Sequence, residues 1–479
     1  MNRAALRRGA PLIAFSLNEM LVAFVRMMIM ARALGPLELG FASTLAATYA
    51  AAEQLADTAI HRFVLASPRE DFRKALAAAH AIALARGLIL CVALSAIAAP
   101  LACGFVRCED WPSFAWLAPV ALIRGFENLE IRVAERDYRY WPQLIASLCS
   151  HGSGLAALVF VGLVWKSHYA YIAYLMVQST VYVAATHLLS TTPYRVAPRS
   201  PLLLNALRYS MPLVLNGIGQ SVMTQGDRLL VAATLGVEEL GLYAVTILIA
   251  LVPISGLFRI IGPLQFAGLH NARDESVRMS RLRLYAIGVP MLAAVYSTAL
   301  VVLVKVMMPL LFGPRFVIDD YAVILLGLIM MFRVCRTEPE TSVFLMRHMT
   351  GRLAVASQSP IASFGFALLF VYFRPGLTSV LLGVACGELF ALVVTLLLSR
   401  ATWGPVWRET LFWTPLAVMV PFLTALGLAE SGWSNMLWVR VAAGFVAVGF
   451  VACLALIRLG PLYREAYAPG SAATHSGPT

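Results

Sequence analysis

The chain is a series of long apolar segments separated by short polar connections. A helix needs about 20 mostly apolar residues to cross the hydrocarbon core of a bilayer. Fourteen stretches meet that requirement, at residues 11–34, 40–66, 75–105, 112–133, 141–165, 168–189, 206–235, 241–270, 282–312, 320–346, 353–373, 376–399, 409–428 and 436–458. The connections leave no room for a domain outside the membrane. The pattern therefore predicts an all-α polytopic membrane protein with about 14 transmembrane helices.

The composition agrees with this prediction and excludes most other classes of protein. Of the 479 residues, 60% are hydrophobic and only 13% are charged, whereas soluble domains are about 45–50% apolar and about 25% charged. These values exclude a soluble enzyme, a disordered chain and a disulfide scaffold.

The net charge of +12 comes from arginine-rich connections, so it does not indicate a nucleic-acid partner. With the N-terminus inside, the cytoplasmic connections and tails hold 22 Lys and Arg residues, and the outer connections hold four. Cytoplasmic loops of membrane proteins carry this excess of positive charge. We therefore expect both termini in the cytoplasm, and the high Ala and Arg content suggests a bacterial inner membrane.

The seven cysteines form no CxxC pair and show no metal-ligand spacing, so the sequence predicts neither a metal nor a cofactor. Most of them lie in apolar segments, where cysteine behaves as a small hydrophobic residue. Cys103 and Cys108 flank the end of a predicted helix that is expected on the periplasmic side. The sequence leaves open whether they form a disulfide.

A shift of 201 residues aligns the first helical hairpin with a later one. The motif LGxxELG occurs at 34–40 and again at 235–241, and Pro11-Leu12 aligns with Pro212-Leu213. Six predicted helices separate the copies, so both have the same orientation, as in parallel repeats about an axis along the membrane normal. The first glycine of each motif is expected to end a helix in the αL conformation.

This repeat predicts two six-helix lobes and a short C-terminal addition. The lobes are expected at 1–199 and 200–400. Two further helices follow in 401–460, and residues 461–479 are expected to form a disordered cytoplasmic tail.

The repeated segments resemble the first hairpin of Wzx-type oligosaccharide flippases of the MATE-like MOP superfamily. The resemblance rests on ARALGPLELG at 31–40, on YSMPL at 209–213 followed by Asp227-Arg228, and on LGVEELGLY at 235–243. It implies a bundle of two lobes around a central cavity. It also implies that an undecaprenyl-diphosphate-linked oligosaccharide moves from the cytoplasmic to the periplasmic leaflet by alternating access, driven by H⁺, Na⁺ or the membrane potential.

Under this resemblance the expected partners are the lipid-linked oligosaccharide and membrane lipids. Contact with other polysaccharide-assembly membrane proteins is left open.

Arginines within the apolar segments are the candidate substrate-binding residues. An arginine at mid-membrane costs at least about 2.5–3.5 kcal/mol on insertion scales, so it faces a cavity or a partner. A diphosphate accepts paired hydrogen bonds from guanidinium groups. The candidates are Arg26, Arg86, Arg124, Arg228, Arg259, Arg333 and Arg336. Structural ion pairs are the alternative explanation for each of them.

Acidic and polar residues in the same segments are candidates for ion coupling and for a hydrated lumen. Glu53, Asp57 and His61 follow at i, i+4 and i+8, so on a continuous helix they share one face, and close carboxylates suit proton coupling. The coupling or ion-pair candidates are Glu19, Glu53, Asp57, His61, Asp227 and Glu388. The lumen candidates are Asn18, Asn216, Gln220 and Thr224. Buried structural networks are the alternative.

Three other functional classes are weighed against a flippase. A small-molecule exporter of the same superfamily would favour an acidic, aromatic cavity for organic cations. A membrane glycan polymerase, ligase or glycosyltransferase would need a large outer loop, and every outer connection here is short. A structural scaffold would not explain the buried charges. We therefore expect a transporter and no catalytic residues.

Overall fold

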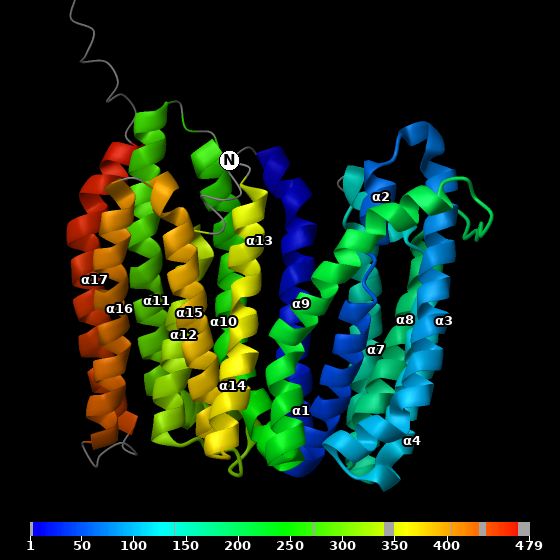
Figure 1. Ribbon diagram of the computed structural model, residues 1–479, viewed down its shortest axis with the longest axis horizontal. Helices are drawn as coiled ribbons and strands as arrows, with labels where there is room; N and C mark the ends of the chain where they lie inside the picture. The colour runs from blue at the N-terminus through cyan, green and yellow to red at the C-terminus, as the bar shows by residue number, and fades with distance from the viewer. Residues whose placement is uncertain are drawn as a thin grey trace, which may run out of the picture. The chain divides into compact units, whose positions relative to one another are not determined.

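The computed structural model is helical throughout the part of the chain that it describes. Residues 3–137, 139–270, 272, 274–339, 349–403, 405–430 and 437–467 are described, and no strand occurs among them (Figure 1). Long apolar segments fold in this way because a helix satisfies its backbone hydrogen bonds within the segment. The predicted all-α class is confirmed.

The chain forms two compact units. Unit 1 consists of Met1–Leu248 with Leu311–Phe316, and unit 2 of Ile249–Leu310 with Val317–Thr479. The predicted lobes at 1–199 and 200–400, the two helices in 401–460 and the tail in 461–479 stay predictions. Residues 468–479 of that tail lie outside the described part of the chain.

Unit 1 is a bundle in which α7 packs along α8 and α1 packs along both α7 and α9. Its helices are α1 (Arg3–Leu55), α2 (Ile60–Ala66), η1 (Arg69–Asp71), α3 (Phe72–Phe105), η2 (Cys108–Asp110), α4 (Trp111–Ala115), α5 (Leu117–Gly125), α6 (Glu130–Val133), η3 (Ala134–Asp137), α7 (Trp141–Trp165), α8 (Tyr169–Leu189) and α9 (Leu203–Leu235).

Helix α10 (Val237–His270) begins in unit 1 and continues into unit 2. In unit 2, α15 packs against α12 and α14, and α16 packs against α12 and α17. The helices after α10 are α11 (Glu275–Phe312), α12 (Asp320–Pro339), α13 (Thr350–Gln358), η5 (Ser359–Ile361), α14 (Ala362–Phe373), α15 (Leu377–Trp403), α16 (Pro405–Glu430) and α17 (Leu437–Tyr467).

Ten helices among the described residues are long and apolar enough to cross a membrane. The first of them, Ala14–Ala66, contains two of the predicted segments, which join at Gly35. Three predicted segments, 112–133, 206–235 and 320–346, are absent from the ten. The first is divided into short helices, and polar or charged residues interrupt the other two. The chain is therefore a multi-pass membrane protein, and the count of fourteen stays a prediction.

The two copies of the LGxxELG motif have the same unusual backbone. Gly35 has φ 80° and ψ 178°, and Gly236 has φ 93° and ψ 171°. The positive φ agrees with the predicted need for glycine. The extended ψ differs from the predicted αL conformation, where ψ is about 47°. The chain leaves the first helix of each hairpin at a sharp kink rather than through a left-handed turn.

The second glycines of the motif, Gly40 and Gly241, bring the two hairpins into direct contact. A Cβ on Gly40 would collide with the carbonyl of Val237, and a Cβ on Gly241 would collide with the carbonyl of Pro36. Pro36 and Val237 are themselves 201 residues apart. Each hairpin therefore places its second glycine against the equivalent residue of the other hairpin. A local twofold axis produces such a reciprocal contact, so the sequence repeat is also a local structural repeat.

A disulfide joins Cys103, near the end of α3, to Cys108 in η2. The structure thus answers the question that the sequence left open. The location of this end of α3 on the outer side of the membrane stays a prediction.

Candidate functional site

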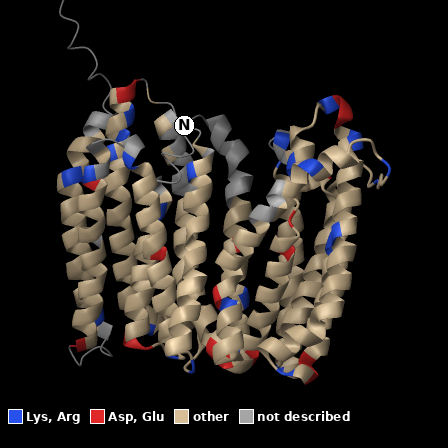
Figure 2. Cartoon of the chain, viewed as in Figure 1, with Lys and Arg blue, Asp and Glu red and all other residues tan. Residues whose placement is uncertain are grey.

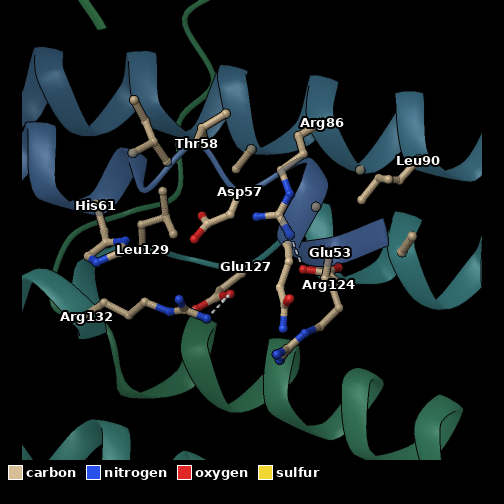
Figure 3. A pocket seen from close by; sticks show the side chains of 16 residues that line it. Glu53, Asp57, Thr58, His61, Arg86, Leu90, Arg124, Glu127, Leu129 and Arg132 are labelled. Carbon is tan, nitrogen blue, oxygen red and sulfur yellow. Dashed lines mark hydrogen bonds and ion pairs between the residues drawn. The ribbon is translucent and has the colours of Figure 1, made fainter. Parts of the chain in front are cut away.

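Two interrupted helices of unit 1 meet at a charged cavity. Helix α1 ends at Leu55 and α2 begins at Ile60, while α5 ends at Gly125 and α6 begins at Glu130. Interrupted helices free backbone groups, and inside a membrane they are tolerated where they line a cavity or are buried in protein. Between the two interruptions lies a cavity of about 210 Å³ (Figure 3). Helix α3 closes it along one side.

At each interruption, side chains accept hydrogen bonds from backbone N–H groups that have no partner within a helix. Asp57 Oδ1 accepts the backbone N–H of Ala59 at 2.8 Å, and Ala59 has φ 42°, a left-handed value rare for alanine. In the second interruption, the backbone N–H of Asn128 donates to Thr186 Oγ1 at 3.0 Å. The backbone N–H of Leu129 donates to the ring of His80 at 3.1 Å. Both breaks are therefore built by specific partners.

A glycine pair sets the position of two cavity arginines. Gly87 of α3 and Gly125 of α5 pack backbone to backbone, and a Cβ on Gly87 would lie 2.8 Å from the Cα of Gly125. Small residues let membrane helices approach this closely. Arg86 and Arg124 are the residues immediately before these glycines, and both line the cavity. The crossing of α3 and α5 therefore brings the two guanidinium groups to one site.

Two of the cavity's arginines are held in ion pairs. Arg86 pairs with Glu53, whose carboxylate also accepts the hydroxyl of Tyr49 at 3.0 Å. Arg132 donates from Nε and Nη2 to the two oxygens of Glu127, at 2.6 and 3.0 Å. Glu127 is buried. Tyr182 donates to it as well, at 3.2 Å.

Three further groups face the cavity and form no ion pair among the residues that the structure describes. Asp57 accepts only the N–H of Ala59, and His61 has no hydrogen bond or ion pair. Arg124 lies over the ring of Tyr182, with its guanidinium carbon 4.6 Å from the ring centroid, and its buried Nη1 has no hydrogen-bond partner. Figure 3 shows Asp57, Arg86, Glu127 and Arg132 directed toward the same space.

The cavity thus combines three carboxylates with three guanidinium groups. With neutral histidine its formal charge is zero, so it neither attracts nor repels ions strongly as a whole. An anion with several oxygens can replace the carboxylates as partner of the arginines. A cation or a proton can take the carboxylates that such an exchange releases. Among the described residues, no group of three or more His, Cys, Asp or Glu side chains could hold a metal ion.

A second polar cluster of unit 1 joins α1 to α7 and α8. Glu19 accepts the hydroxyl of Ser147 at 2.5 Å and contacts the ring of His151 at 3.1 Å. Asn18 donates to the same serine at 2.9 Å. The other ring nitrogen of His151 lies 2.7 Å from the hydroxyl of Tyr174.

Arg26 completes this cluster through aromatic rings rather than through a carboxylate. Its guanidinium carbon lies 4.9 Å from the ring centroid of Tyr174 and 5.6 Å from that of Tyr171. Contacts of this kind stabilise a cation that has left water. No ion pair joins Arg26 to Glu19 among the described residues, although both lie on the same face of α1.

Two of the polar residues predicted on α9 form hydrogen bonds with side chains of other helices. Thr224 donates to Gln54 Oε1 of α1 at 2.8 Å, which places it beside the charged cavity that Gln54 lines. Asp227 accepts the hydroxyl of Tyr243 at 2.5 Å.

Two other predicted residues of α9 carry no such contact among the described residues. Gln220 is exposed, and Arg228 forms no ion pair among the described residues. The side chain of Asn216 lies outside the described part of the chain.

In unit 2, two predicted arginines share one predicted acid. Arg333 of α12 pairs with Glu388 of α15 at 2.5 Å, and Arg336 Nε lies 3.5 Å from the other carboxylate oxygen. Glu388 is 1% exposed. The side chain of Arg259, in α10, lies outside the described residues.

The structure corrects one detail of the sequence interpretation and adds residues to it. Glu53, Asp57 and His61 do not share a face of one continuous helix, because the helix ends at Leu55 between the first two. They meet at the cavity instead. Arg132, which is not among the candidate residues of the sequence analysis, lines the cavity as well.

The sequence interpretation also missed His151, Tyr174 and Tyr182. All three are polar groups within apolar spans, and for His151 an ionisable residue inside a predicted span was the available signal.

Comparison with solved structures shows the fold. The chain is similar to the lipid II flippase MurJ in an inward closed conformation, with a TM-score of 0.69 and 11% identity over 93% of this chain and 99% of that one. It is also similar to a multidrug resistance MATE family transporter of the MOP superfamily. The inward-facing structure gives a TM-score of 0.53 and the outward-facing one 0.52, both at 16% identity. They cover 84% of this chain and 96% or 95% of the other.

Comparison with curated protein sequences finds no match. The sequence profile of a family described as "Polysaccharide biosynthesis protein" matches residues 29–317, more than half of the chain. That match includes both copies of the LGxxELG motif and every residue that lines the charged cavity. With the MurJ-like and MATE-like fold of its helices, the chain belongs to this family of polysaccharide biosynthesis proteins.

Proposed function

We propose that this protein moves an undecaprenyl-diphosphate-linked oligosaccharide from the cytoplasmic to the periplasmic leaflet of a bacterial inner membrane. Membership of the polysaccharide biosynthesis family supports a role in making a surface glycan. The likeness of fold to the lipid II flippase MurJ supports transport of a lipid-linked molecule. Both termini lie in the cytoplasm in this proposal, and the lobes 1–199 and 200–400 alternate access.

The observation that carries the proposal is the charged cavity of unit 1. It holds Arg86, Arg124 and Arg132 among the apolar helices of unit 1. An arginine within a membrane-spanning segment costs free energy during insertion, so three at one site need a compensating role. The ion pairs of Arg86 and Arg132 offset part of that cost. Arg124 forms no ion pair or hydrogen bond with a carboxylate of the described chain, and an anionic substrate supplies a directly bonded anionic partner.

The cavity supports an exchange of partners as the transport step. Phosphate oxygens take the place of Glu53 and Glu127 on their arginines, and Arg124 supplies a further donor. Guanidinium groups suit this step because each can form two parallel hydrogen bonds to phosphate. The released carboxylates, together with Asp57, then bind the coupling ion, either H⁺ or Na⁺. Binding of substrate and ion are thereby linked through the same side chains.

The other predicted residues have supporting roles in this proposal. Arg26, Arg228, Arg259, Arg333 and Arg336 are further candidate contacts for the anionic substrate. Glu19, Asp227 and Glu388 are further ion-pair or coupling groups, and Asn18, Asn216, Gln220 and Thr224 keep the lumen polar. The proposal assigns no catalytic step to the chain. Contact with other polysaccharide-assembly membrane proteins fits the family but has no residue assigned to it.

The proposal is tested by deleting the gene in the native host and extracting polyprenyl-linked glycans. We expect complete repeat units to accumulate in the inner leaflet and surface glycan to disappear. Reintroducing the wild-type chain restores the glycan, whereas R26A, R228A or R333A at equal protein level restores less. Normal surface glycan with no accumulated intermediate would overturn the substrate assignment, and a small-molecule exporter of the same fold would then become the leading function.

A further inference from the structure

A second cavity of unit 1 lies outside the charged cavity, between the N-terminal end of α3 and the connection from α8 to α9. Its volume is about 840 Å³. The charged residues that line it are Arg73, Lys74, Arg195 and Arg199, and no Asp or Glu is among its described lining residues. Figure 2 shows Lys and Arg gathered at this end of unit 1, around α2 and the start of α3. We call it the basic cavity.

The connection that forms one wall of the basic cavity is fixed in place. His80 of α3 is 1% exposed, and its Nδ1 lies 3.0 Å from the carbonyl oxygen of Arg195. Its Nε2 accepts the backbone N–H of Leu129. Both contacts are satisfied only by the neutral ring with its proton on Nδ1. The backbone N–H of Ala197 also donates to the carbonyl of Ala77 at 3.1 Å. The cavity is therefore preformed.

Three of its four cations are available to a ligand. Lys74 lies 3.5 Å from Asp71, one turn earlier, and both side chains are exposed. Arg73, Arg195 and Arg199 form no ion pair with any described residue. Arg73 and Lys74 also lie in the first turn of α3, where the helix carries a partial positive charge. Four positive side chains close to the positive N-terminal end of α3 repel one another and the helix end. An anion bound in the basic cavity would offset this repulsion.

The location and the apolar part of the lining indicate the source of the anion. The connection 190–202 is predicted on the cytoplasmic side, where the inner leaflet carries anionic lipids. The cavity is lined by the exposed side chain of Val196 as well as by the cations. We propose that the basic cavity binds the phosphate-bearing headgroup of an anionic phospholipid of the inner leaflet. A soluble phosphate compound carries the same charge, but it has no apolar group to contact the apolar lining of the cavity.

The test measures binding to the purified full-length chain in a neutral detergent by titration calorimetry. The probes are dihexanoyl phosphatidylglycerol, dihexanoyl phosphatidylcholine and inorganic pyrophosphate. The test variant is R195Q/R199Q. The matched control is R278Q/R408Q, which removes the partly exposed Arg278 and the exposed Arg408 from unit 2. All four arginines are at the surface, so we expect both variants to fold. Their elution volume and Tm verify this.

We expect phosphatidylglycerol to bind and phosphatidylcholine to bind weakly. Each basic residue near an anionic lipid contributes about fivefold in affinity, so R195Q/R199Q should bind about thirtyfold more weakly than wild type. R278Q/R408Q should bind like wild type, and added salt should weaken binding. Equal affinity of wild type and R195Q/R199Q for phosphatidylglycerol overturns the site. Pyrophosphate binding that R195Q/R199Q weakens, without binding of phosphatidylglycerol, overturns the lipid as the ligand of the basic cavity. Because both results compare wild type with R195Q/R199Q, neither depends on diphosphate binding at the charged cavity.

Discussion

The pair Arg132–Glu127 gives the sharpest energetic test of the charged cavity. Glu127 is buried at 6% exposure and accepts two hydrogen bonds from Arg132 and one from Tyr182. Removing one partner of a buried ion pair costs about 3–5 kcal/mol, because the other charge stays buried without compensation. One third of the Arg132 side chain is exposed, so the lower end, about 3 kcal/mol, applies. An ordinary hydrogen bond between membrane helices averages only about 0.6 kcal/mol.

A double-mutant cycle distinguishes a buried ion pair, worth about 3 kcal/mol, from an ordinary interhelical hydrogen bond, worth about 0.6 kcal/mol. E127Q and R132Q should each lower the free energy of unfolding by about 3 kcal/mol. The double variant E127Q/R132Q should lose clearly less than the sum, because neither charge is then left alone. The assay is unfolding of the purified protein in mixed micelles with increasing denaturing detergent.

The matched control for this cycle is the pair Arg278–Glu275 of unit 2. It has the same shortest N···O distance, 2.6 Å, but both side chains are exposed. Exposed pairs contribute about 0–1 kcal/mol. A coupling energy as small for Arg132–Glu127 as for Arg278–Glu275 would refute the argument that the cavity pairs are buried.

Three further predictions concern the glycine crossing, the disulfide and unit 2. G87A should lower stability by about 1–3 kcal/mol and reduce transport, because a Cβ would lie 2.8 Å from the facing backbone; G152A, which meets nothing within 4 Å, should do neither in thermal unfolding and flipping assays. Maleimide should label Cys103 and Cys108 only after reduction, and labelling of both in unreduced protein would contradict the bond. E388Q should destabilise the protein by about 3 kcal/mol, because two arginines lose their shared carboxylate, and an unchanged Tm would contradict this.

Much of the fold follows from the sequence because the membrane allows few alternatives. Long apolar runs can only become helices there, and most of the predicted segments are helices in the structure. The repeat was visible as LGxxELG because Gly35 and Gly236 need a positive φ, and because Gly40 and Gly241 touch backbone to backbone. Only glycine meets these backbone requirements, so the repeat can be recognised in a single sequence.

The positions of the helix interruptions are less visible in the sequence. Residues 56–59 and 126–129 contain neither proline nor glycine, although the second interruption directly follows Gly125. Polar residues stand at both interruptions, but polar residues also occur within continuous helices such as α9. The breaks are stabilised by groups distant in sequence, such as Thr186 and His80 against the second one. A single sequence does not show these pairings. It therefore predicted that Glu53, Asp57 and His61 lie together, and it gave the wrong geometry for how they meet.

The choice of ion partners could not be predicted either. Arg124 and Glu127 are three residues apart, a spacing that favours an ion pair on a continuous helix. However, α5 ends at Gly125, and Glu127 forms its ion pair with Arg132 instead. The guanidinium group of Arg124 lies over the ring of Tyr182. The partners of Arg124 are thus set by tertiary structure.

The most direct test of the account is the flipping of a radiolabelled lipid-linked oligosaccharide by the purified protein in liposomes. Arg124 is the decisive residue, since its Nη1 has no partner in the described chain and a diphosphate would give it one. The account predicts that R124Q is folded but flips at least about tenfold more slowly, the effect of losing about 1.4 kcal/mol of substrate stabilisation. R124K should restore part of the rate, because lysine keeps the charge without the planar fork. Flipping by R124Q at the wild-type rate would contradict the claim that the arginines of the charged cavity bind the substrate.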